Sequence, residues 1–280
     1  MKLGELLKKH DFKFSKKYGQ NFLSDGNLLE AIADKGGVNP NTPVLEIGCG
    51  AGTLTKVLCS KAKYVYGYEI DRTLAPVLGE NLAGIENCDI TFKDIMREKT
   101  QEIENRIGEE YLLVANLPYY ITTPIIMKFV EESQLCKGIV IMVQDEVARR
   151  ICSREGTADY GAITASINLV ASSERILSVP RTMFFPAPNV DSAVVKIIFD
   201  RDKYPDVDKK IYRDTVRAAF LSRRKTLVNN LREWLKTDKQ RAEDLLTKCN
   251  IDILARGETL SESDFVTLSL AIKSEFFTAK

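Results

Sequence analysis

Residues Asn116-Leu117-Pro118-Tyr119-Tyr120 form a corner whose chemistry suits the alkylation of a weakly nucleophilic amine. A nucleobase amine has its lone pair delocalised into the ring, so a site that methylates it gains from two acceptors that pull both N–H bonds out of the ring plane. The Asn116 side-chain oxygen and the Leu117 carbonyl could be these acceptors. Pro118 favours an extended conformation at Leu117, and Tyr119 offers a ring on which a base can stack. An ordinary turn between a strand and a helix is the alternative interpretation.

A glycine-rich turn, Gly48-Cys49-Gly50-Ala51-Gly52, lies upstream of this corner, and a helix is predicted to begin after it at about Thr53. Such turns let a ligand approach the backbone closely. The spacing is G-x-G-x-G with Glu46 two positions before the first glycine, which differs from the G-x-G-x-x-G of the dinucleotide fingerprint. The turn therefore indicates a cofactor site without identifying the cofactor.

Two acidic residues stand at the ends of the next two predicted strands. At Glu69 a carboxylate can accept both hydroxyls of a ribose, and at Asp94 it can accept from an adenine amine. Either acid could instead cap a helix or begin one. Ligands of open α/β sheets bind outside the carboxyl ends of the strands. We therefore expect the glycine turn, both acids and Asn116 to line one pocket.

The elements that must position these residues belong to an α/β fold. From about residue 43 to 145, short apolar runs alternate with helix-compatible stretches, which is the pattern of a parallel sheet built from βαβ units. Two later runs are expected to add an antiparallel edge pair. The predicted strands are Val44–Ile47, Tyr64–Ile70, Asp89–Lys93, Tyr111–Ala115, Gly138–Val143, Arg175–Val179 and Ala193–Phe199.

A charged segment from Asp200 to Asp208, which contains Pro205, is interpreted as a linker. Beyond it, apolar residues recur at a spacing of three to four, which predicts a small helical bundle. The predicted helices are Ile211–Leu221, Leu227–Leu235, Ala242–Lys248 and Asp264–Phe276. The expected organisation is a basic leader over residues 1–25, a catalytic domain over 26–200 and a helical domain over 208–280.

Composition argues against several classes of chemistry. His10 is the single histidine, which disfavours histidine metal sites and Ser-His or Cys-His catalysis. The six cysteines include no C-x-x-C pair, which argues against a zinc site and a disulfide framework. No apolar run approaches the length of a membrane span, and the N-terminus lacks the apolar core of a secretory signal. We expect a cytoplasmic protein without a metal.

Positive charge is concentrated in two places although the net charge is only +1. One cluster lies in the leader and the other in a predicted helical region near residue 220, so that they lie on either side of Asn116 in the sequence. Each cluster could be a solvated surface; together they suggest contacts to nucleic acid. The candidate RNA-binding residues are Lys16, Lys17, Arg223, Arg224 and Lys225.

Three long motifs go beyond these local patterns. They are Lys17-Tyr18-Gly19-Gln20-Asn21-Phe22-Leu23, a run from Phe184 to Val195 of the form F-x-P-x-P-x-V-D-S-A-V-V, and a run from Phe220 to Thr226 of the form F-x-x-R-R-K-T. With them, nearly the whole chain resembles the class I S-adenosylmethionine-dependent methyltransferases. More narrowly, it resembles the KsgA (RsmA) family of small-subunit ribosomal RNA adenine dimethyltransferases.

This resemblance implies a Rossmann-like sheet with a small C-terminal helical domain, and S-adenosylmethionine as the cofactor. It implies methyl transfer to N6 of two adjacent adenines in the 3'-terminal hairpin loop of 16S ribosomal RNA, within the immature small subunit. We expect the enzyme to be a monomer. The cofactor contacts that the resemblance implies are Asn21, Leu23, Gly48, Gly50, Glu69, Asp94 and Asn116.

The target adenine is expected to leave its stack and enter a slot between Tyr119 and Phe184. Phe184 could instead be a core residue, although the adjacent Phe185 is the better core candidate. Asn21 and Leu23 suggest that the leader folds over the bound cofactor as a lid.

Other functions stay open at this point. An erythromycin-resistance-type methyltransferase of 23S ribosomal RNA shares much of the pattern, but the V-D-S-A-V-V run and the residues after Asn116 favour the small-subunit branch. An assembly factor that has lost catalysis is disfavoured by the intact Asn116 corner and Glu69. A dinucleotide-dependent oxidoreductase is disfavoured because the full fingerprint is missing.

Overall fold

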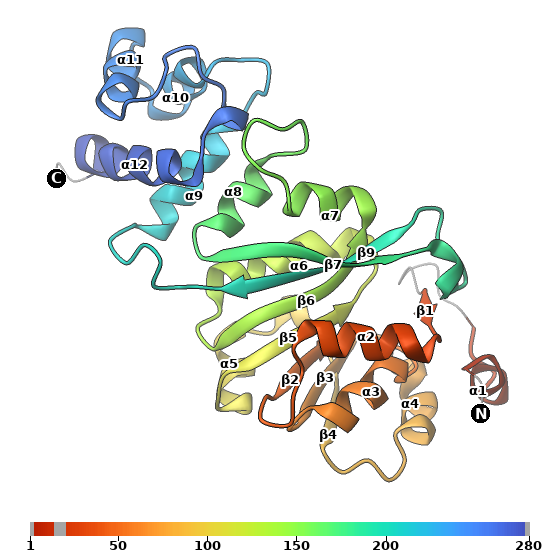
Figure 1. Ribbon diagram of the computed structural model, residues 1–280. Helices are drawn as coiled ribbons and strands as arrows, with labels where there is room; N and C mark the ends of the chain where they lie inside the picture. Colours follow the sequence, from red (N-terminus) through yellow and green to blue (C-terminus); the bar gives the residue numbers. More distant parts are fainter. Residues whose placement is uncertain (1–2, 14–20, 278–280) are drawn as a thin grey trace. The chain divides into compact units, whose positions relative to one another are not determined.

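The computed structural model describes residues 3–13 and 21–277 of the chain. Its main feature is a seven-stranded sheet with the strand order β4-β3-β2-β5-β6-β9-β7 (Figure 1). The strands are β2 (Val44–Ile47), β3 (Val65–Glu69), β4 (Cys88–Phe92), β5 (Tyr111–Asn116), β6 (Cys136–Gln144), β7 (Ala171–Val179) and β9 (Ser192–Phe199). A separate antiparallel pair joins β1 (Phe22–Leu23) to β8 (Phe184–Phe185).

The pairing within the sheet confirms the predicted α/β fold. Strands β2, β3, β4, β5 and β6 pair in parallel, whereas β6 and β9 are antiparallel. All residues of the central strand β2 are buried, as expected for a parallel strand covered on both faces. The carboxyl ends of β2, β3 and β5 therefore open at the same edge of the sheet.

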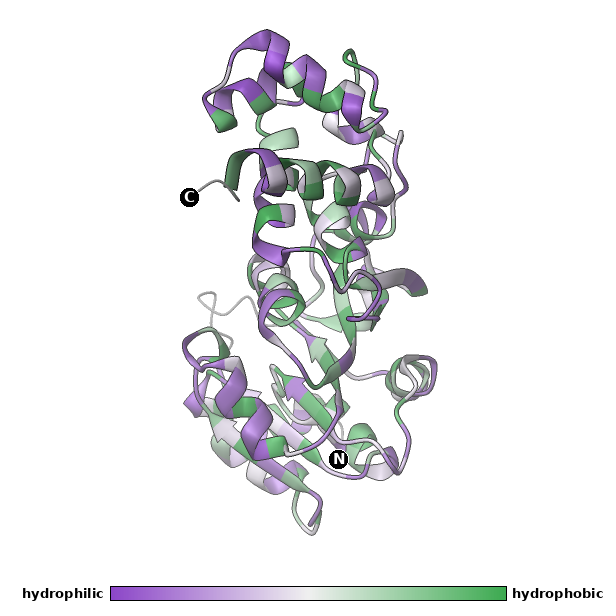
Figure 2. Ribbon diagram, turned by 90° about the vertical axis from the view of Figure 1, so that its left-hand side faces the viewer, coloured by the Kyte–Doolittle hydropathy of each residue, from purple (hydrophilic) through white to green (hydrophobic). Residues whose placement is uncertain are grey.

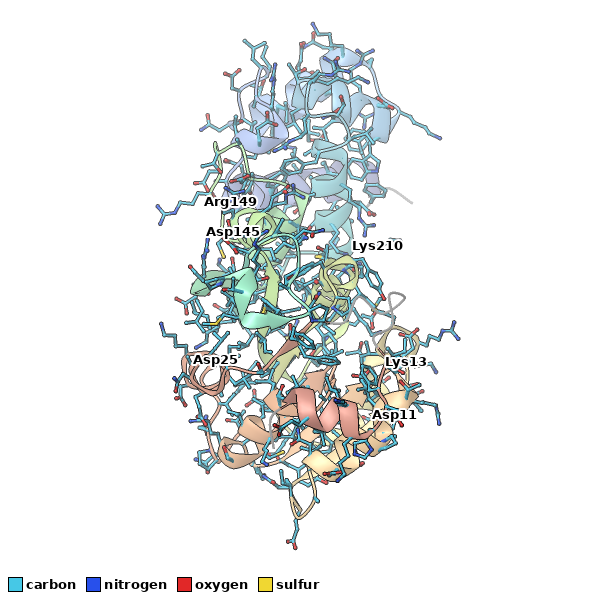
Figure 3. All side chains as sticks on the ribbon, turned by 90° about the vertical axis from the view of Figure 1, so that its right-hand side faces the viewer. Asp11, Lys13, Asp25, Asp145, Arg149 and Lys210 are labelled. Atoms are coloured by element: carbon cyan, nitrogen blue, oxygen red, sulfur yellow. The ribbon has the colours of Figure 1, made fainter. Side chains whose placement is uncertain are left out.

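Helices cover both faces of this sheet (Figure 1). The first unit of the chain contains α1 (Leu3–Lys9), α2 (Gly26–Gly36), α3 (Thr53–Lys61), α4 (Ala75–Asn81), α5 (Thr100–Ile107) and α6 (Tyr119–Glu132). Apolar residues of α2 and α3 share one buried cluster with residues of the sheet. Asp25, labelled in Figure 3, begins α2 by accepting from the Leu28 backbone N–H at 2.8 Å, and Gly37 ends it in the left-handed conformation.

The chain forms two compact units, which comprise residues 1–148 with 174–199 and residues 149–173 with 200–280. The helices of the second part of the chain are α7 (Asp145–Ile151), which crosses this boundary, α8 (Ala162–Asn168), α9 (Lys209–Ala219), α10 (Leu227–Leu235), α11 (Lys239–Lys248) and α12 (Glu262–Ile272). Short 3-10 turns occur at Arg72–Leu74, Ile95–Arg97, Arg181–Met183 and Gly257–Thr259, and a π-helical turn at Lys273–Phe277.

The second unit takes in a segment that the sequence analysis assigned to the catalytic domain. Residues 149–173 group with the C-terminal helices. The Tyr212 hydroxyl on α9 donates to the Ala165 carbonyl on α8 at 2.9 Å, and Tyr212 is fully buried. This long-range contact explains why residues distant in sequence share one core.

The basic residues of the Phe220–Thr226 motif were expected in a helical region near residue 220, but the structure places them outside the helices. Helix α9 ends at Ala219 and α10 begins at Leu227, so the motif lies in the connection between them. The buried Asn230 side chain donates to the carbonyls of Ala219 at 2.9 Å and Ser222 at 3.2 Å. Because these carbonyls are satisfied by a side chain, the backbone can leave the helix without losing hydrogen bonds.

Hydropathy along the ribbon agrees with this arrangement. Figure 2 shows many helices with alternating hydrophilic and hydrophobic colours, as expected for helices that present one face to a core. Within residues 3–13 and 21–277, no helix is long and apolar enough to cross a membrane.

Candidate active site

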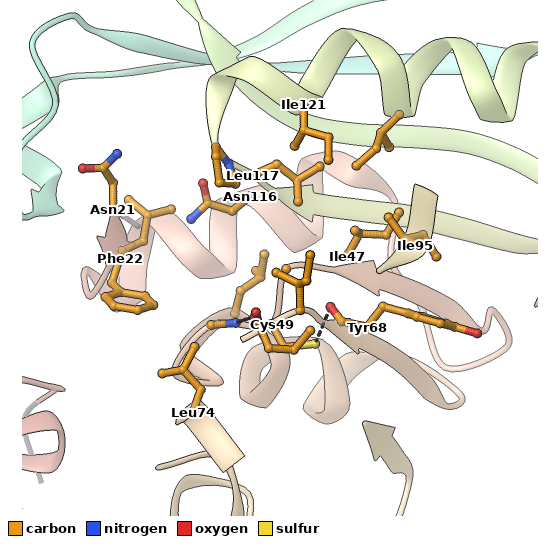
Figure 4. A pocket seen from close by; sticks show the side chains of 18 of the residues that line it. Asn21, Phe22, Ile47, Cys49, Tyr68, Leu74, Ile95, Asn116, Leu117 and Ile121 are labelled. Carbon is orange, nitrogen blue, oxygen red and sulfur yellow. Dashed lines mark hydrogen bonds between the residues drawn. The ribbon is translucent and has the colours of Figure 1, made fainter. Parts of the chain in front are cut away.

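A pocket in the first unit lies at the carboxyl ends of β2, β3 and β5 (Figure 4). It brings together every residue predicted for the cofactor and for catalysis. These lining residues are Asn21, Leu23, Gly48, Gly50, Glu69, Asp94, Asn116, Leu117, Pro118, Tyr119 and Phe184. The predicted RNA contacts Lys16 and Lys17 lie outside the described residues, and Arg223, Arg224 and Lys225 belong to the second unit.

The glycine turn brings backbone to the pocket where side chains would interfere. Gly48 and Gly50 have φ angles of +79° and +57°. A Cβ at Gly50 would lie 2.8 Å from the Phe22 ring, and one at Gly48 would lie 2.9 Å from the Leu117 side chain. Only glycine combines this conformation with this closeness, so a ligand can approach the backbone here.

The Glu69 carboxylate is held in place by backbone N–H groups on both oxygens. Its Oε2 accepts from Gly50 at 2.8 Å and its Oε1 accepts from Asp71 at 2.8 Å. Burial raises the pKa of Glu69, although these N–H groups oppose the rise. Each oxygen keeps a second lone pair that can accept a ribose hydroxyl. Glu69 is not a helix cap: Asp71 is the residue that caps the following turn.

Asp94 can act in both of the ways considered from the sequence, as a cap and as an acceptor for an adenine amine. Its Oδ1 accepts from the Met96 backbone N–H at 3.0 Å, so it caps the turn after β4. It also lines the pocket. Capping therefore fixes the orientation of a carboxylate that can still accept a hydrogen bond from a ligand.

Glu46 has an unusual environment that the sequence analysis did not single out as functional. It is 1% exposed, and its Oε2 has no hydrogen-bond partner among the described residues. Burial raises the pKa of Glu46 to about 7, against smaller opposing effects of the Thr55 hydroxyl and the Cys49 thiol. Its place two residues before the glycine turn was the only available signal.

The Asn116 corner is both a strand-to-helix turn and a wall of the pocket. Asn116 ends β5, Pro118 is the N-cap residue of α6, and Tyr119 begins that helix. Figure 4 shows Asn116 and Leu117 on the opposite side of the pocket from Cys49 of the glycine turn. Among the described residues, none donates to the Asn116 side-chain oxygen or to the Leu117 carbonyl. Two acceptors that take no hydrogen bond from the described part of the chain thus lie at one site.

Of the two adjacent phenylalanines, Phe184 is buried and Phe185 is exposed, although Phe185 was the better core candidate from the sequence. The prediction that Phe185 is a core residue is wrong, because its exposed fraction is 54%. Phe184 is only 5% exposed; it belongs to the buried cluster and also lines the pocket. Adjacent strand residues point to opposite faces, so burying Phe184 in β8 directs Phe185 outward.

The leader contacts the pocket through β1. Leu23 pairs with Phe184, and the Leu23 carbonyl accepts from the Thr53 hydroxyl at 2.9 Å. The backbone of the leader is therefore joined both to the start of α3 and to the segment that carries Phe184. Thr53 was predicted only as a helix start, and its link to Leu23 depends on a long-range approach that no local pattern reveals.

The basic residues of the second unit have unequal surroundings. The Arg223 guanidinium donates to the carbonyls of Tyr160 at 2.6 Å and Ala158 at 3.1 Å. Lys225 forms an ion pair with Glu233 at 3.0 Å, and Arg224 is exposed. Arg223 therefore braces a loop of its own unit. Within the described residues, no group of His, Cys, Asp or Glu side chains could hold a metal ion.

Comparisons with known proteins agree with this geometry. The model of the ribosomal RNA adenine dimethylase family matches residues 11–269. The ribosomal RNA small subunit methyltransferase A of Bacillus cytotoxicus is 42% identical, covering 96% of this chain and 94% of that protein. The corresponding protein of Geobacillus kaustophilus is 41% identical, covering 97% and 95%.

Two solved structures share the fold over most of the chain. A dimethyladenosine transferase from Plasmodium falciparum has a TM-score of 0.80 and 25% identity, covering 91% of this chain and 100% of that one. The 23S rRNA methyltransferase ErmE has a TM-score of 0.69 and 27% identity, covering 90% and 100%. The family model and the curated relatives extend over nearly the whole chain, with the pocket inside the matched region. The chain belongs to the ribosomal RNA adenine dimethylase family.

Proposed function

We propose that this protein transfers methyl groups from S-adenosylmethionine to N6 of two adjacent adenines in the 3'-terminal hairpin loop of 16S ribosomal RNA. The product is a pair of N6,N6-dimethyladenines, made during biogenesis of the small subunit. One observation carries the proposal: Asn116 Oδ1 and the Leu117 carbonyl, two acceptors to which no described residue donates, share a pocket with the glycine turn and Glu69. The small-subunit name of the curated relatives supports this choice of RNA.

The residues of the pocket fit S-adenosylmethionine. The glycine turn leaves backbone open where a Cβ would collide, and the restrained Glu69 carboxylate has lone pairs for the ribose hydroxyls. Asp94 can accept from the adenine amine of the cofactor. Asn21 and Leu23 line the leader side of the same pocket. When bound, the cofactor supplies an electrophilic methyl group on a sulfonium.

The protein acts on the substrate by orientation. Tyr119 and Phe184 form the two walls between which a flipped adenine stacks. The Asn116 oxygen and the Leu117 carbonyl accept the two N6 hydrogens, which turns the amine lone pair out of conjugation. No general base is required at the amine, and holding the reactants in line supplies most of the rate. The second transfer needs the methylated amine to rotate within the same corner.

Contacts outside the pocket select the RNA. Arg224, Lys225 and the leader residues Lys16 and Lys17 are suited to phosphates, which position an RNA without reading its sequence. The partner is the immature small subunit, and the enzyme acts as a monomer in the cytoplasm.

The 23S rRNA methyltransferase ErmE shares the fold at 27% identity, whereas the small-subunit enzymes are 41 to 42% identical over nearly the whole chain.

An Asn116→Ala variant tests the role of the corner. It should keep the thermal midpoint of the wild type and lose turnover by about a hundredfold or more, since one oriented contact to the reacting group is removed. Turnover is measured as transfer of labelled methyl groups to immature small subunits. Asn41→Ala removes an exposed asparagine in the turn after α2 and should leave turnover unchanged. Full activity in Asn116→Ala would overturn the assigned role.

A further inference from the structure

A hydrogen bond joins the stacking tyrosine of the pocket to a residue with no assigned role. The Tyr119 hydroxyl lies 2.8 Å from the Ser192 hydroxyl. Tyr119 is the first residue of α6 and Ser192 the first residue of β9. Ser192 is only 1% exposed and does not line the pocket. Its hydroxyl is therefore linked to the pocket through Tyr119.

Ser192 occupies a firmly held position. Its backbone pairs with Gln144 at the end of β6, and the carbonyl of the preceding Asp191 accepts from the Asp145 N–H at 3.1 Å. The Asp191 carboxylate accepts from the Arg181 N–H at 2.8 Å, which closes the loop that carries Phe184. The same strand end thus anchors both the loop with one wall of the slot and the ring that forms the other.

The Tyr119 ring needs such an anchor. A tyrosine is attached through single bonds about which its ring can swing, and no side-chain cap stabilises the start of α6. A hydrogen bond at the far end of the ring restricts this swing. A tyrosine phenol carries its proton at neutral pH, and burial raises the pKa of Tyr119 further, so either hydroxyl of the pair can donate to the other. A half-buried phenol also gains from having a partner at this position.

We propose that Ser192 is a positioning residue for methyl transfer, which sets the tilt of the Tyr119 ring and its separation from Phe184. The inference rests on the proposed function, because the slot between these rings is where the target adenine stacks. Ser192 touches neither adenine nor cofactor. It acts by keeping the slot at the width of one purine before the RNA arrives, so that the amine meets the Asn116 corner in a reactive orientation.

A double-mutant cycle on Ser192→Ala and Tyr119→Phe tests this inference. Each single change removes one side of the same hydrogen bond and should lower kcat on immature small subunits roughly 3- to 10-fold, the range for one such bond. The double variant should be no slower than the slower single variant, because the bond can be lost only once. The KM for S-adenosylmethionine and the thermal midpoint should match the wild type.

Ser269→Ala is a matched control, because Ser269 is 2% exposed and donates to the Val266 carbonyl in α12. It should leave kcat unchanged. Wild-type kcat in Ser192→Ala would overturn the inference, and so would losses that multiply in the double variant. Absence of methyl transfer to small subunits by the wild-type protein would overturn the proposed function as well, so the two failures are distinguishable.

Discussion

The carboxyl group of Glu46 illustrates how a single residue beneath the site responds to its surroundings. It is almost fully buried, and burial raises its pKa to about 7. In the unfolded chain the pKa of a glutamate carboxyl is about 4.3. Between these two pH values the folded protein binds a proton that the unfolded chain has released. The free energy of unfolding therefore falls as pH rises through this window and no longer changes above it.

Replacing Glu46 by glutamine removes the ionisable group and should remove this pH dependence. The stability of Glu46→Gln relative to the wild type should rise between about pH 4 and pH 7, by about 2 to 4 kcal/mol in total. Urea unfolding at a series of pH values measures the difference. A variant whose stability parallels that of the wild type through the whole window would contradict a strongly raised pKa at Glu46.

The glycine turn and the β1–β8 pair are the elements that shape the pocket. Gly50→Ala should weaken S-adenosylmethionine binding by roughly tenfold or more, because a Cβ would press on Phe22 at 2.8 Å in addition to its backbone strain. Calorimetric titration with S-adenosylmethionine measures the affinity.

Gly84→Ala separates the contact from the strain. Gly84 also has a positive φ, of +80°, but a Cβ there would meet nothing within 4 Å. Gly84→Ala should lower the free energy of unfolding by about 1 kcal/mol or more, as the backbone strain in Gly50→Ala does. It should keep the wild-type affinity for S-adenosylmethionine. Equal weakening of binding by both variants would show that contact with Phe22 is not the cause.

Elements were predictable from the sequence where the pattern was local. Alternating apolar runs predicted the parallel strands, and strand order then placed Glu69, Asp94 and Asn116 at one edge. The pairing of Leu23 with Phe184 was not predictable, since it depends on the approach of segments far apart in the sequence. For the same reason the exposures of Phe184 and Phe185 could not be assigned from their neighbours.

The connection between α9 and α10 shows the same limit. The Phe220–Thr226 motif has helix-compatible residues, yet Asn230 satisfies the carbonyls that let the chain turn. Arg223 was predicted as an RNA contact from its charge, and nothing in the sequence indicated which carbonyls of the protein it contacts. Its donation to the Tyr160 and Ala158 carbonyls depends on a loop that is more than sixty residues away.

For the whole molecule, we expect Arg224 to contribute to RNA binding and Arg223 to contribute mainly to stability. Arg224→Ala should weaken binding to small-subunit RNA and reduce the dependence of log affinity on log salt by about one, as expected for one lost phosphate contact. Arg223→Ala should instead lower the free energy of unfolding by about 1 to 3 kcal/mol, because two carbonyls lose their donor. Filter binding at several salt concentrations and thermal unfolding measure the two effects. An unchanged salt dependence in Arg224→Ala would remove it from the RNA surface.

The base that the protein modifies can be identified directly. Immature small subunits and, separately, large-subunit RNA are incubated with the protein and labelled S-adenosylmethionine, and the methylated nucleosides are mapped. We expect N6,N6-dimethyladenine at two adjacent adenines of the 3'-terminal hairpin loop of 16S ribosomal RNA, with no label in the large-subunit RNA. Methylation of 23S ribosomal RNA, or no transfer to the small subunit, would contradict it.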